Sequence, residues 1–205
     1  YRPDSFYLDN GVTTMLGRRV ARIAPDRHSL TLEDDAEIAY DKLLVATGSS
    51  PAYPPIAGLA QVENKTTFFS LDDAEKLESM LAADSRVLIM GAGLIGLKCA
   101  EGIAAKAGSV TVMDLADHIL PSILDADAAQ RVQAQMEANG VSLLLARQAE
   151  RFEPDAAVLD NGARLPFDIL VVATGGRPNA ELIAEAGGEV GRGIVTDERC
   201  ATGLP

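Results

Sequence analysis

The sequence is poor in the residues that most often carry redox and metal chemistry. It contains no tryptophan, two cysteines and two histidines, and aromatic residues make up only 4% of the chain. Cys99 and Cys200 are far apart, so they form neither a Cys-x-x-Cys pair nor the ligand spacing of a zinc site. We therefore predict no metal site. Cys99 shares a helical stripe with Ile95 and Gly102, and we predict that it is a buried, inert thiol.

Basic charge is also scarce. Lysine and arginine total 18 against 30 acidic residues, and the net charge of −12 excludes the basic footprint that nucleic acids and anionic membranes require. No apolar run approaches the roughly 20 residues of a membrane span, and no signal-peptide pattern opens the chain. With 47% hydrophobic residues, we expect one large or two small domains of a soluble, cytoplasmic protein that contacts neither nucleic acid nor membrane.

What the sequence does contain is a strand, a glycine turn and a helix start in direct succession. Val87–Met90 is apolar, and a segment rich in alanine and leucine follows the turn. Such a turn lets backbone N–H groups approach a pyrophosphate at the positive end of the helix dipole, and its third glycine allows close helix–strand contact. The other interpretation is an ordinary tight connection between strand and helix. The predicted cofactor-binding residues here are Gly91, Ala92, Gly93, Leu94, Ile95 and Gly96.

An acidic residue lies where dinucleotide binding requires one. A second predicted strand, Val110–Met113, ends in Asp114, 23 positions after Gly91 (114 − 91). A carboxylate at that point accepts hydrogen bonds from the adenosine ribose hydroxyls and repels a 2′-phosphate. Asp117 adds a second negative charge, and no arginine lies between Asp114 and Pro121. We therefore predict NADH, rather than NADPH, as the dinucleotide.

Two stretches of the chain follow the same plan. Asn10-Gly11 answers Asn139-Gly140 with an offset of 129 (139 − 10), and Ala46-Thr47-Gly48 answers Ala173-Thr174-Gly175 with an offset of 127 (173 − 46). Each stretch is expected to contain a three-stranded excursion followed by a buried strand. The predicted strands are 12–16, 19–24, 29–32, 38–40 and 43–46 in the first stretch, and 141–145, 147–153, 156–159 and 169–172 in the second.

The glycine turn and Asp114 precede the second stretch, whereas no equivalent turn precedes the first. We therefore expect a fragment that holds one nearly complete nucleotide-binding domain and the remnant of another. The two stretches end in Y-D-K-L-L-V-A-T-G-S and D-I-L-V-V-A-T-G-G-R-P-N. Together with the glycine turn, these motifs resemble the FAD- and NAD(P)-dependent pyridine nucleotide-disulfide oxidoreductase family, and the resemblance spans essentially the whole chain.

This resemblance implies an α/β fold class. The expected fold is a Rossmann-like parallel sheet with a three-stranded antiparallel excursion, inserted into a partial second nucleotide-binding domain. Residues 1–58 would form the distal part of the FAD-binding domain, and residues 59–180 the NAD(H)-binding Rossmann domain. Residues 181–205 would be a return segment toward the FAD domain.

The resemblance also implies that hydride passes from NADH to FAD and on to a disulfide, an electron-carrier protein or another acceptor. We expect the FAD site to be incomplete in this chain and the fragment alone to be inactive, and we assign no catalytic residue. Further cofactor-binding residues are predicted in the turns after the two buried strands. They are Thr174, Gly175 and Gly176 at the nicotinamide half of NADH, and Ala46, Thr47 and Gly48 in the FAD domain.

Several alternatives stay open at this point. The chain could instead be a non-catalytic NADH-sensing module, or a flavin-free NAD-dependent dehydrogenase, although no acid or base is placed for the latter. Members of the family often carry glutamate where this chain has Lys98, which could be a solvated helix residue or could attract the pyrophosphate. The partners are NADH and an electron acceptor that the sequence does not identify, and a homo-oligomer is left open.

Overall fold

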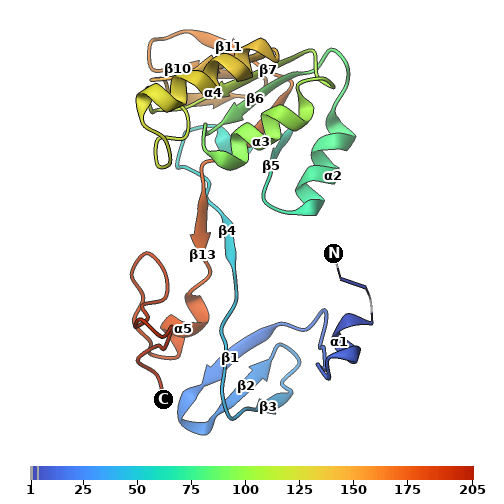
Figure 1. Ribbon diagram of the computed structural model, residues 1–205, viewed down its shortest axis with the longest axis vertical. Helices are drawn as coiled ribbons and strands as arrows, with labels where there is room; N and C mark the ends of the chain where they lie inside the picture. Colours follow the sequence, from blue (N-terminus) through green and yellow to red (C-terminus); the bar gives the residue numbers. More distant parts are fainter. Residues whose placement is uncertain (1, 4) are drawn as a thin grey trace. The chain divides into compact units, whose positions relative to one another are not determined.

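The computed structural model describes residues 2–3 and 5–205. Tyr1 and Asp4, which the predicted first domain includes, lie outside the described residues. The chain forms two compact units (Figure 1). The larger unit is Ser50–Arg177, and the smaller combines the described residues up to Ser49 with Pro178–Pro205. The predicted insertion of one unit into another is therefore present, while the assignment of each unit to a cofactor stays a prediction.

A five-stranded parallel sheet forms the centre of the larger unit. Its strands run in the spatial order β5 (Lys65–Thr67), β12 (Ile169–Val172), β6 (Arg86–Met90), β7 (Ser109–Met113) and β8 (Val141–Leu144). Every neighbouring pair is parallel. The central strands are continuous apolar runs because both of their faces are covered, as is usual for parallel sheets.

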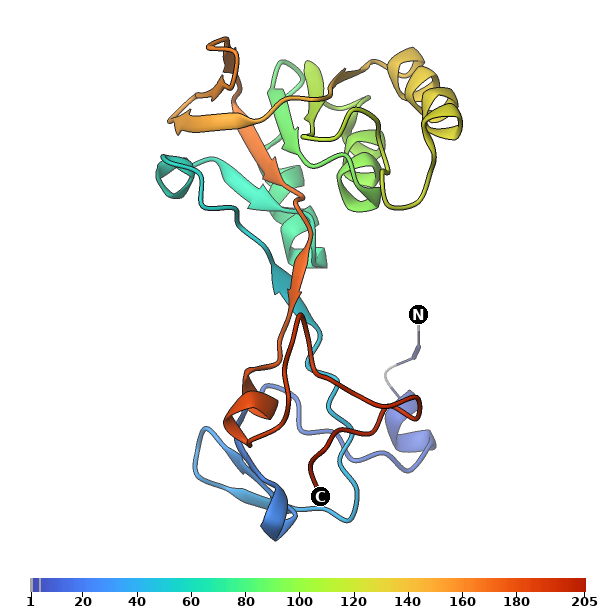
Figure 2. The same cartoon turned by 90° about the vertical axis from the view of Figure 1, so that its left-hand side faces the viewer.

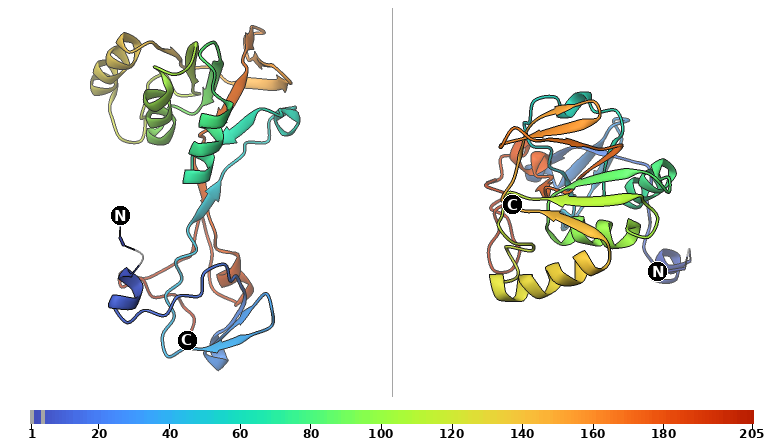
Figure 3. Two further views of the ribbon diagram at one scale, coloured as in Figure 1. Left: turned by 90° about the vertical axis from the view of Figure 1, so that its right-hand side faces the viewer. Right: turned by 90° about the horizontal axis from the view of Figure 1, so that it is seen from above.

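Three helices cover one face of this sheet. They are α2 (Leu71–Met80), α3 (Leu94–Ile103) and α4 (Ala126–Ala138). Side chains from all three, such as Leu77, Leu97 and Met136, pack against the strand residues that point to this face. Figure 3 shows the sheet from above, with α3 and α4 on one side and β10 on the other.

An antiparallel sheet covers the opposite face. It consists of β9 (Ala149–Glu153), β10 (Ala156–Leu159) and β11 (Arg164–Pro166), with the short 3-10 helix η2 (Leu59–Gln61) beside it. Phe152 and Phe167 meet edge to face there, with ring centroids 6.1 Å apart. This is the predicted excursion, and the predicted α/β fold class with a Rossmann-like parallel sheet is confirmed.

The smaller unit contains a second antiparallel sheet of β1 (Val20–Ala24), β2 (Ser29–Leu32) and β3 (Glu37–Ala39). Figure 2 shows these strands in blue with helix α5 (Glu181–Glu185) beside them, and α5 packs on β1. The remaining elements of this unit are the helix α1 (Phe6–Asp9) and the 3-10 helix η1 (Pro25–Arg27). Where the chain passes between the units, β4 (Ser49–Pro51) pairs with β13 (Gly176–Pro178).

The internal repeat predicted from the sequence is present in the strands. Adding 129 to the bounds of β1 gives β9, and adding 127 to the bounds of β2 and β3 gives β10 and β11. The same offset of 127 relates β4 to β13. The two copies therefore share one supersecondary plan.

Two predicted strands are wrong. Residues 12–16 and 43–46 contain no strand, and Leu16 and Leu44 are 83% and 87% exposed. The equivalent of 43–46 in the second copy is β12, which lies between β5 and β6. A central parallel strand forms only where neighbours bond its backbone on both sides, and no described strand lies beside 43–46. In the described part of the chain, no helix is both long and apolar enough to cross a membrane.

Candidate functional site

The glycine turn lies at the carboxyl end of β6, where ligands bind in open parallel sheets. Gly91 has φ +116°, and a Cβ there would collide with the carbonyl oxygen of Ala173 at the end of β12. A Cβ on Gly96 would collide with the carbonyl oxygen of Gly91. These two glycines therefore allow the turn, the helix α3 and the strand β12 to pack closely.

Gly93 is different from the other two glycines of the turn. Its φ and ψ of −76° and −179° are accessible to any residue, so backbone freedom is not the reason for a glycine here. A Cβ built on Gly93 would have nothing within 4 Å. The space beside Gly93 is therefore open, as the predicted approach of a pyrophosphate to this backbone requires.

The start of α3 lacks the side-chain cap that the two other long helices of this unit have. Ser70 and Asp73 form a capping box at α2, and Asp125 accepts a hydrogen bond from Ala128 N at α4. At α3 the N-cap is Gly93, and no side chain in the described residues caps it. The first N–H groups of α3 thus need acceptors, which a phosphate group would supply. The turn fits a pyrophosphate.

Asp114 lies beside this turn, as predicted from its spacing. Its Oδ2 accepts a hydrogen bond from Ala92 N at 2.6 Å, and its Oδ1 accepts one from Ala116 N at 2.8 Å. A carboxylate offers about four acceptor positions, so capacity for ribose hydroxyls is left. The bond to Ala92 joins two residues 22 positions apart, and sequence reasoning did not predict it.

The loop after Asp114 contains a second acidic residue, which contacts a histidine. Asp117 Oδ1 lies 2.6 Å from His118 Nδ1. This hydrogen bond raises the pKa of His118 and lowers the pKa of Asp117. Ile119 is fully buried, and Leu120 N donates to the carbonyl oxygen of Ala92 at 2.9 Å.

The turn after β12 meets the glycine turn through Ala173. Thr174 Oγ1 donates to the carbonyl oxygen of Ala52 at 2.7 Å, and Ala52 N donates to the carbonyl oxygen of Gly175 at 2.9 Å. A Cβ on Gly176 would lie 2.9 Å from the Phe69 ring. Asp73 Oδ2 accepts a hydrogen bond from Phe69 N, which holds the backbone of Phe69 beside Gly176. Ala52 and Phe69 are neighbours of the site that the sequence did not reveal.

The predicted residues Ala46, Thr47 and Gly48 belong to the smaller unit. Thr47 Oγ1 donates to the carbonyl oxygen of Asn179 at 2.6 Å, and Asn179 N donates to the carbonyl oxygen of Gly48 at 3.0 Å. These contacts are the counterparts of those around Thr174, because Asn179 stands 127 positions after Ala52 (179 − 52). Their role in binding FAD stays a prediction.

Two residues of α3, Lys98 and Cys99, carry predictions from the sequence. Lys98 is exposed and its Nζ lies 2.5 Å from Glu101 Oε2, which favours the interpretation as a solvated helix residue. Cys99 is fully buried, and burial raises the pKa of its thiol to about 12. The predicted burial of Cys99 is confirmed, and its inertness stays a prediction that the raised pKa supports, since the reactive form of cysteine is the thiolate.

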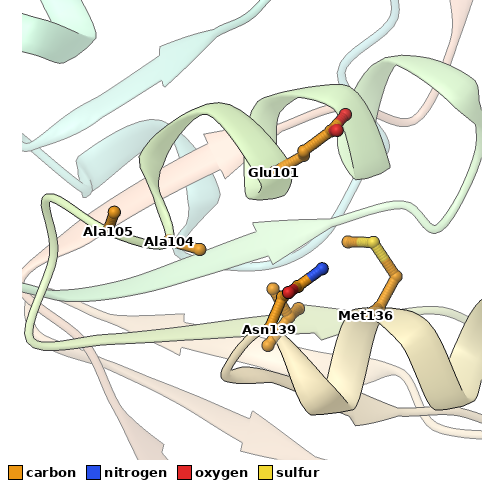
Figure 4. Close-up of a pocket in the computed structure, with 6 residues that line it drawn as sticks. Glu101, Ala104, Ala105, Met136 and Asn139 are labelled. Atoms are coloured by element: carbon orange, nitrogen blue, oxygen red, sulfur yellow. The ribbon is translucent and has the colours of Figure 1, made fainter.

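A pocket of about 260 Å³ lies at the other end of α3. Glu101, Ala104 and Ala105 line it from α3 and the residues after it, opposite Met136 and Asn139 at the end of α4 (Figure 4). It is remote from the glycine turn along the helix axis, so it is separate from the predicted dinucleotide site.

The larger unit has the architecture of a Rossmann-type nucleotide-binding unit. It is a parallel sheet with an uncapped glycine turn after the central strand β6 and an acidic residue, Asp114, after the neighbouring strand β7. Residues 4–205 match the family described as pyridine nucleotide-disulphide oxidoreductase. The chain belongs to this family, and the family predicted from the sequence motifs is confirmed.

Relatives with established names cover nearly the whole chain. The epsilon subunit of the NADH-dependent phenylglyoxylate dehydrogenase of Aromatoleum evansii is 33% identical, and the rubredoxin-NAD(+) reductase of Pseudomonas putida is 30% identical. Each match covers 98% of this chain, but 48% and 53% of the relative. Putidaredoxin reductase, solved as a covalent complex with putidaredoxin, matches with a TM-score of 0.91 and 31% identity over 100% of this chain and 51% of its own. The chain thus spans about half the length of these relatives.

Proposed function

We propose that this chain is the NADH-binding part of a flavoprotein oxidoreductase that passes hydride from NADH to FAD and on to an electron-carrier protein. The observation that carries the proposal is the uncapped start of α3, with open space at Gly93 and Asp114 beside the turn. An anion site next to a carboxylate suits a molecule with a pyrophosphate and adjacent ribose hydroxyls, and a dinucleotide has both.

The residues divide this task among them. The N–H groups at the start of α3 would hold the pyrophosphate, and Asp114 would accept hydrogen bonds from the adenosine ribose. The turn at Thr174, Gly175 and Gly176, held by Ala52 and Phe69, would offer backbone groups to the nicotinamide half. The bound nicotinamide and flavin supply the hydride chemistry, and the protein supplies orientation and electrostatics.

The charges around Asp114 support NADH over NADPH. A 2′-phosphate would meet the negative charge of Asp114, which accepts hydrogen bonds beside the turn. Repulsion between a carboxylate and a nearby phosphate disfavours the binding of NADPH. Leu115, which follows Asp114 and is 69% exposed, is uncharged, so it offers no cation to a 2′-phosphate.

The names of the relatives support a protein carrier as the acceptor. The P. putida relative is named for rubredoxin, and the solved neighbour was captured with putidaredoxin. We therefore propose a small redox protein as the acceptor of this chain.

Stopped-flow reduction of bound flavin in the full-length protein tests this function. We expect NADH to bleach the flavin absorbance, with a kcat/KM at least about tenfold above that for NADPH, about 1.4 kcal/mol. Leu115→Arg should raise kcat/KM for NADPH several-fold, whereas the control Leu115→Gln should not. A flavin that NADH leaves oxidised would contradict the proposal and favour the NADH-sensing module. A preparation that oxidises NADH without flavin would favour the flavin-free dehydrogenase.

A further inference from the structure

The segment after β7 holds both backbone polar groups of Ala92. Ala92 N donates to Asp114 Oδ2 at 2.6 Å, and Leu120 N donates to the carbonyl oxygen of Ala92 at 2.9 Å. Ala92 is fully buried, so each of these groups needs a partner within the protein. Because Ala92 is the one residue with a side chain between Gly91 and Gly93, holding it restrains the most flexible part of the turn.

Asp114 is itself held firmly. Its N–H donates to the carbonyl oxygen of Leu144, and its own carbonyl oxygen accepts the N–H of Arg147, at 3.1 and 3.0 Å. Its Oδ1 accepts from Ala116 N, which orients the carboxylate so that Oδ2 faces Ala92. A hydrogen bond from an amide to a carboxylate is stronger than one between neutral groups, and 2.6 Å is short for such a bond. The carboxylate therefore acts as a fixed support for the turn.

Leu120 contributes the second bond from an unfavourable backbone conformation. Its φ of +53° lies in the left-handed region, which residues with a side chain rarely adopt. Ile119, immediately before it, is fully buried in the core on the helix side of the sheet, with Leu120 and Leu124 packed against that core. The burial of Ile119 thus keeps Leu120 N directed at Ala92.

We propose that Asp114 is a positioning residue for the phosphate-binding turn in addition to its role as a ribose ligand. Its bond to Ala92 sets the backbone of the turn before any nucleotide binds, with Leu120 as the second support. This inference rests on the proposed function, since it concerns the same NADH site. It differs in consequence, because loss of the carboxylate then weakens phosphate binding even when the ligand has no ribose hydroxyls.

Two ligands separate these roles. ADP and 2′,3′-dideoxyadenosine 5′-diphosphate are titrated calorimetrically into the wild-type chain, into Asp114→Asn and into the control Asp127→Asn. The control has the same change of charge at an exposed position in the first turn of α4. We expect Asp114→Asn to weaken both ligands, the dideoxy ligand by about fivefold or more, as for a lost charge-assisted hydrogen bond. Equal binding of the dideoxy ligand to the wild type and Asp114→Asn would overturn the proposal.

Amide hydrogen exchange measured by NMR tests the same inference without a nucleotide. In the ligand-free wild type, we expect the Ala92 amide to be protected, and the Leu94 and Ile95 amides at the uncapped helix start to exchange much faster. In an Asp114→Ala variant that keeps the wild-type Tm, Ala92 should lose its protection, since no side-chain oxygen is left to accept its N–H. An Ala92 amide that exchanges in the wild type as fast as Leu94 and Ile95 would overturn the proposal, even if the variant did not fold. Absence of ADP and NADH binding would instead contradict the proposed function and leave this exchange result measurable.

Discussion

The two copies of the repeated plan end alike in sequence and differently in structure. The second copy ends in β12 (Ile169–Val172), whose four residues are all buried and which pairs with β5 on one side and β6 on the other. The equivalent residues of the first copy lie near Leu44, which is 87% exposed, and they form no strand in the described part of the chain. The same apolar run therefore forms a central strand only where neighbouring strands are supplied.

The turns that follow these runs, in contrast, make equivalent hydrogen bonds in the two copies. Thr174 and Thr47 each donate a side-chain hydrogen bond to the backbone carbonyl of a residue in the other copy, Ala52 and Asn179 respectively. The bonds are 2.7 and 2.6 Å long. These contacts depend only on the pairing of β4, from the first copy, with β13, from the second. The hydrogen bonds of the turns are thus preserved in both copies, whereas the preceding run forms a central strand only in the second copy, where β5 and β6 lie beside it.

Truncating a leucine of the apolar run should give the largest difference in stability between the two copies. Leu170→Ala, in the fully buried β12, is expected to destabilise the larger unit by about 2–5 kcal/mol, since it leaves a cavity between packed layers. Leu44→Ala in the first copy should change the free energy of unfolding by less than about 0.5 kcal/mol. Urea denaturation measures both. Similar losses for the two variants would show that the first copy is also a packed strand.

The aspartate before each run should give a smaller contrast. Asp168 makes a bidentate ion pair with Arg86, whereas its equivalent, Asp41, is exposed. Because the Asp168–Arg86 side chains are nearly half exposed, Asp168→Asn should cost only about 1 kcal/mol, and Asp41→Asn close to nothing. A loss of stability in Asp41→Asn as large as that in Asp168→Asn would contradict the difference between the copies.

The ion pair also predicts a dependence on pH. The hydrogen bonds from Arg86 lower the pKa of Asp168 from 3.8 to about 2. A lowered pKa stabilises the folded state above the unfolded-state value, and this contribution is lost as pH falls from about 4 through about 2. The stability difference between wild type and Asp168→Asn should therefore be constant above about pH 5 and shrink below it. A difference that grows on acidification would be inconsistent with this sign.

The smallest expected effect concerns the shared turns. Thr174→Val and Thr47→Val each remove one exposed hydrogen bond, so each should lower stability by about 0.5 kcal/mol. Thermal unfolding monitored by circular dichroism, with the exposed Thr196→Val as a control, measures the shift in Tm. Equal small shifts would support the equivalence of the two turns, and a large shift in only one of them would break it.

Local signals in the sequence predicted much of this architecture. The glycine turn locates the end of β6 and the start of α3, and Asp114 locates the end of β7; Ser70 and Asp125, the observed N-caps of α2 and α4, are residue types that favour helix starts. These features are local because caps and turns are formed by residues close in sequence. What could not be predicted depends on distant partners: the absence of a strand at 43–46, the bond from Ala92 to Asp114, and the contact of Phe69 with Gly176.

Calorimetric titration of NADH into the wild type and Gly93→Val tests the central claim most directly. The valine is compatible with the φ and ψ of Gly93 and meets nothing within 4 Å at its Cβ, so the fold should persist. Gly102→Val is the control, because Gly102 also has an open environment but lies in the third turn of α3. We predict 1:1 binding of NADH to the wild type and the control, and loss of binding by at least about a hundredfold in Gly93→Val, since the side chain occupies the pyrophosphate position. Undiminished NADH binding by a folded Gly93→Val would contradict the account.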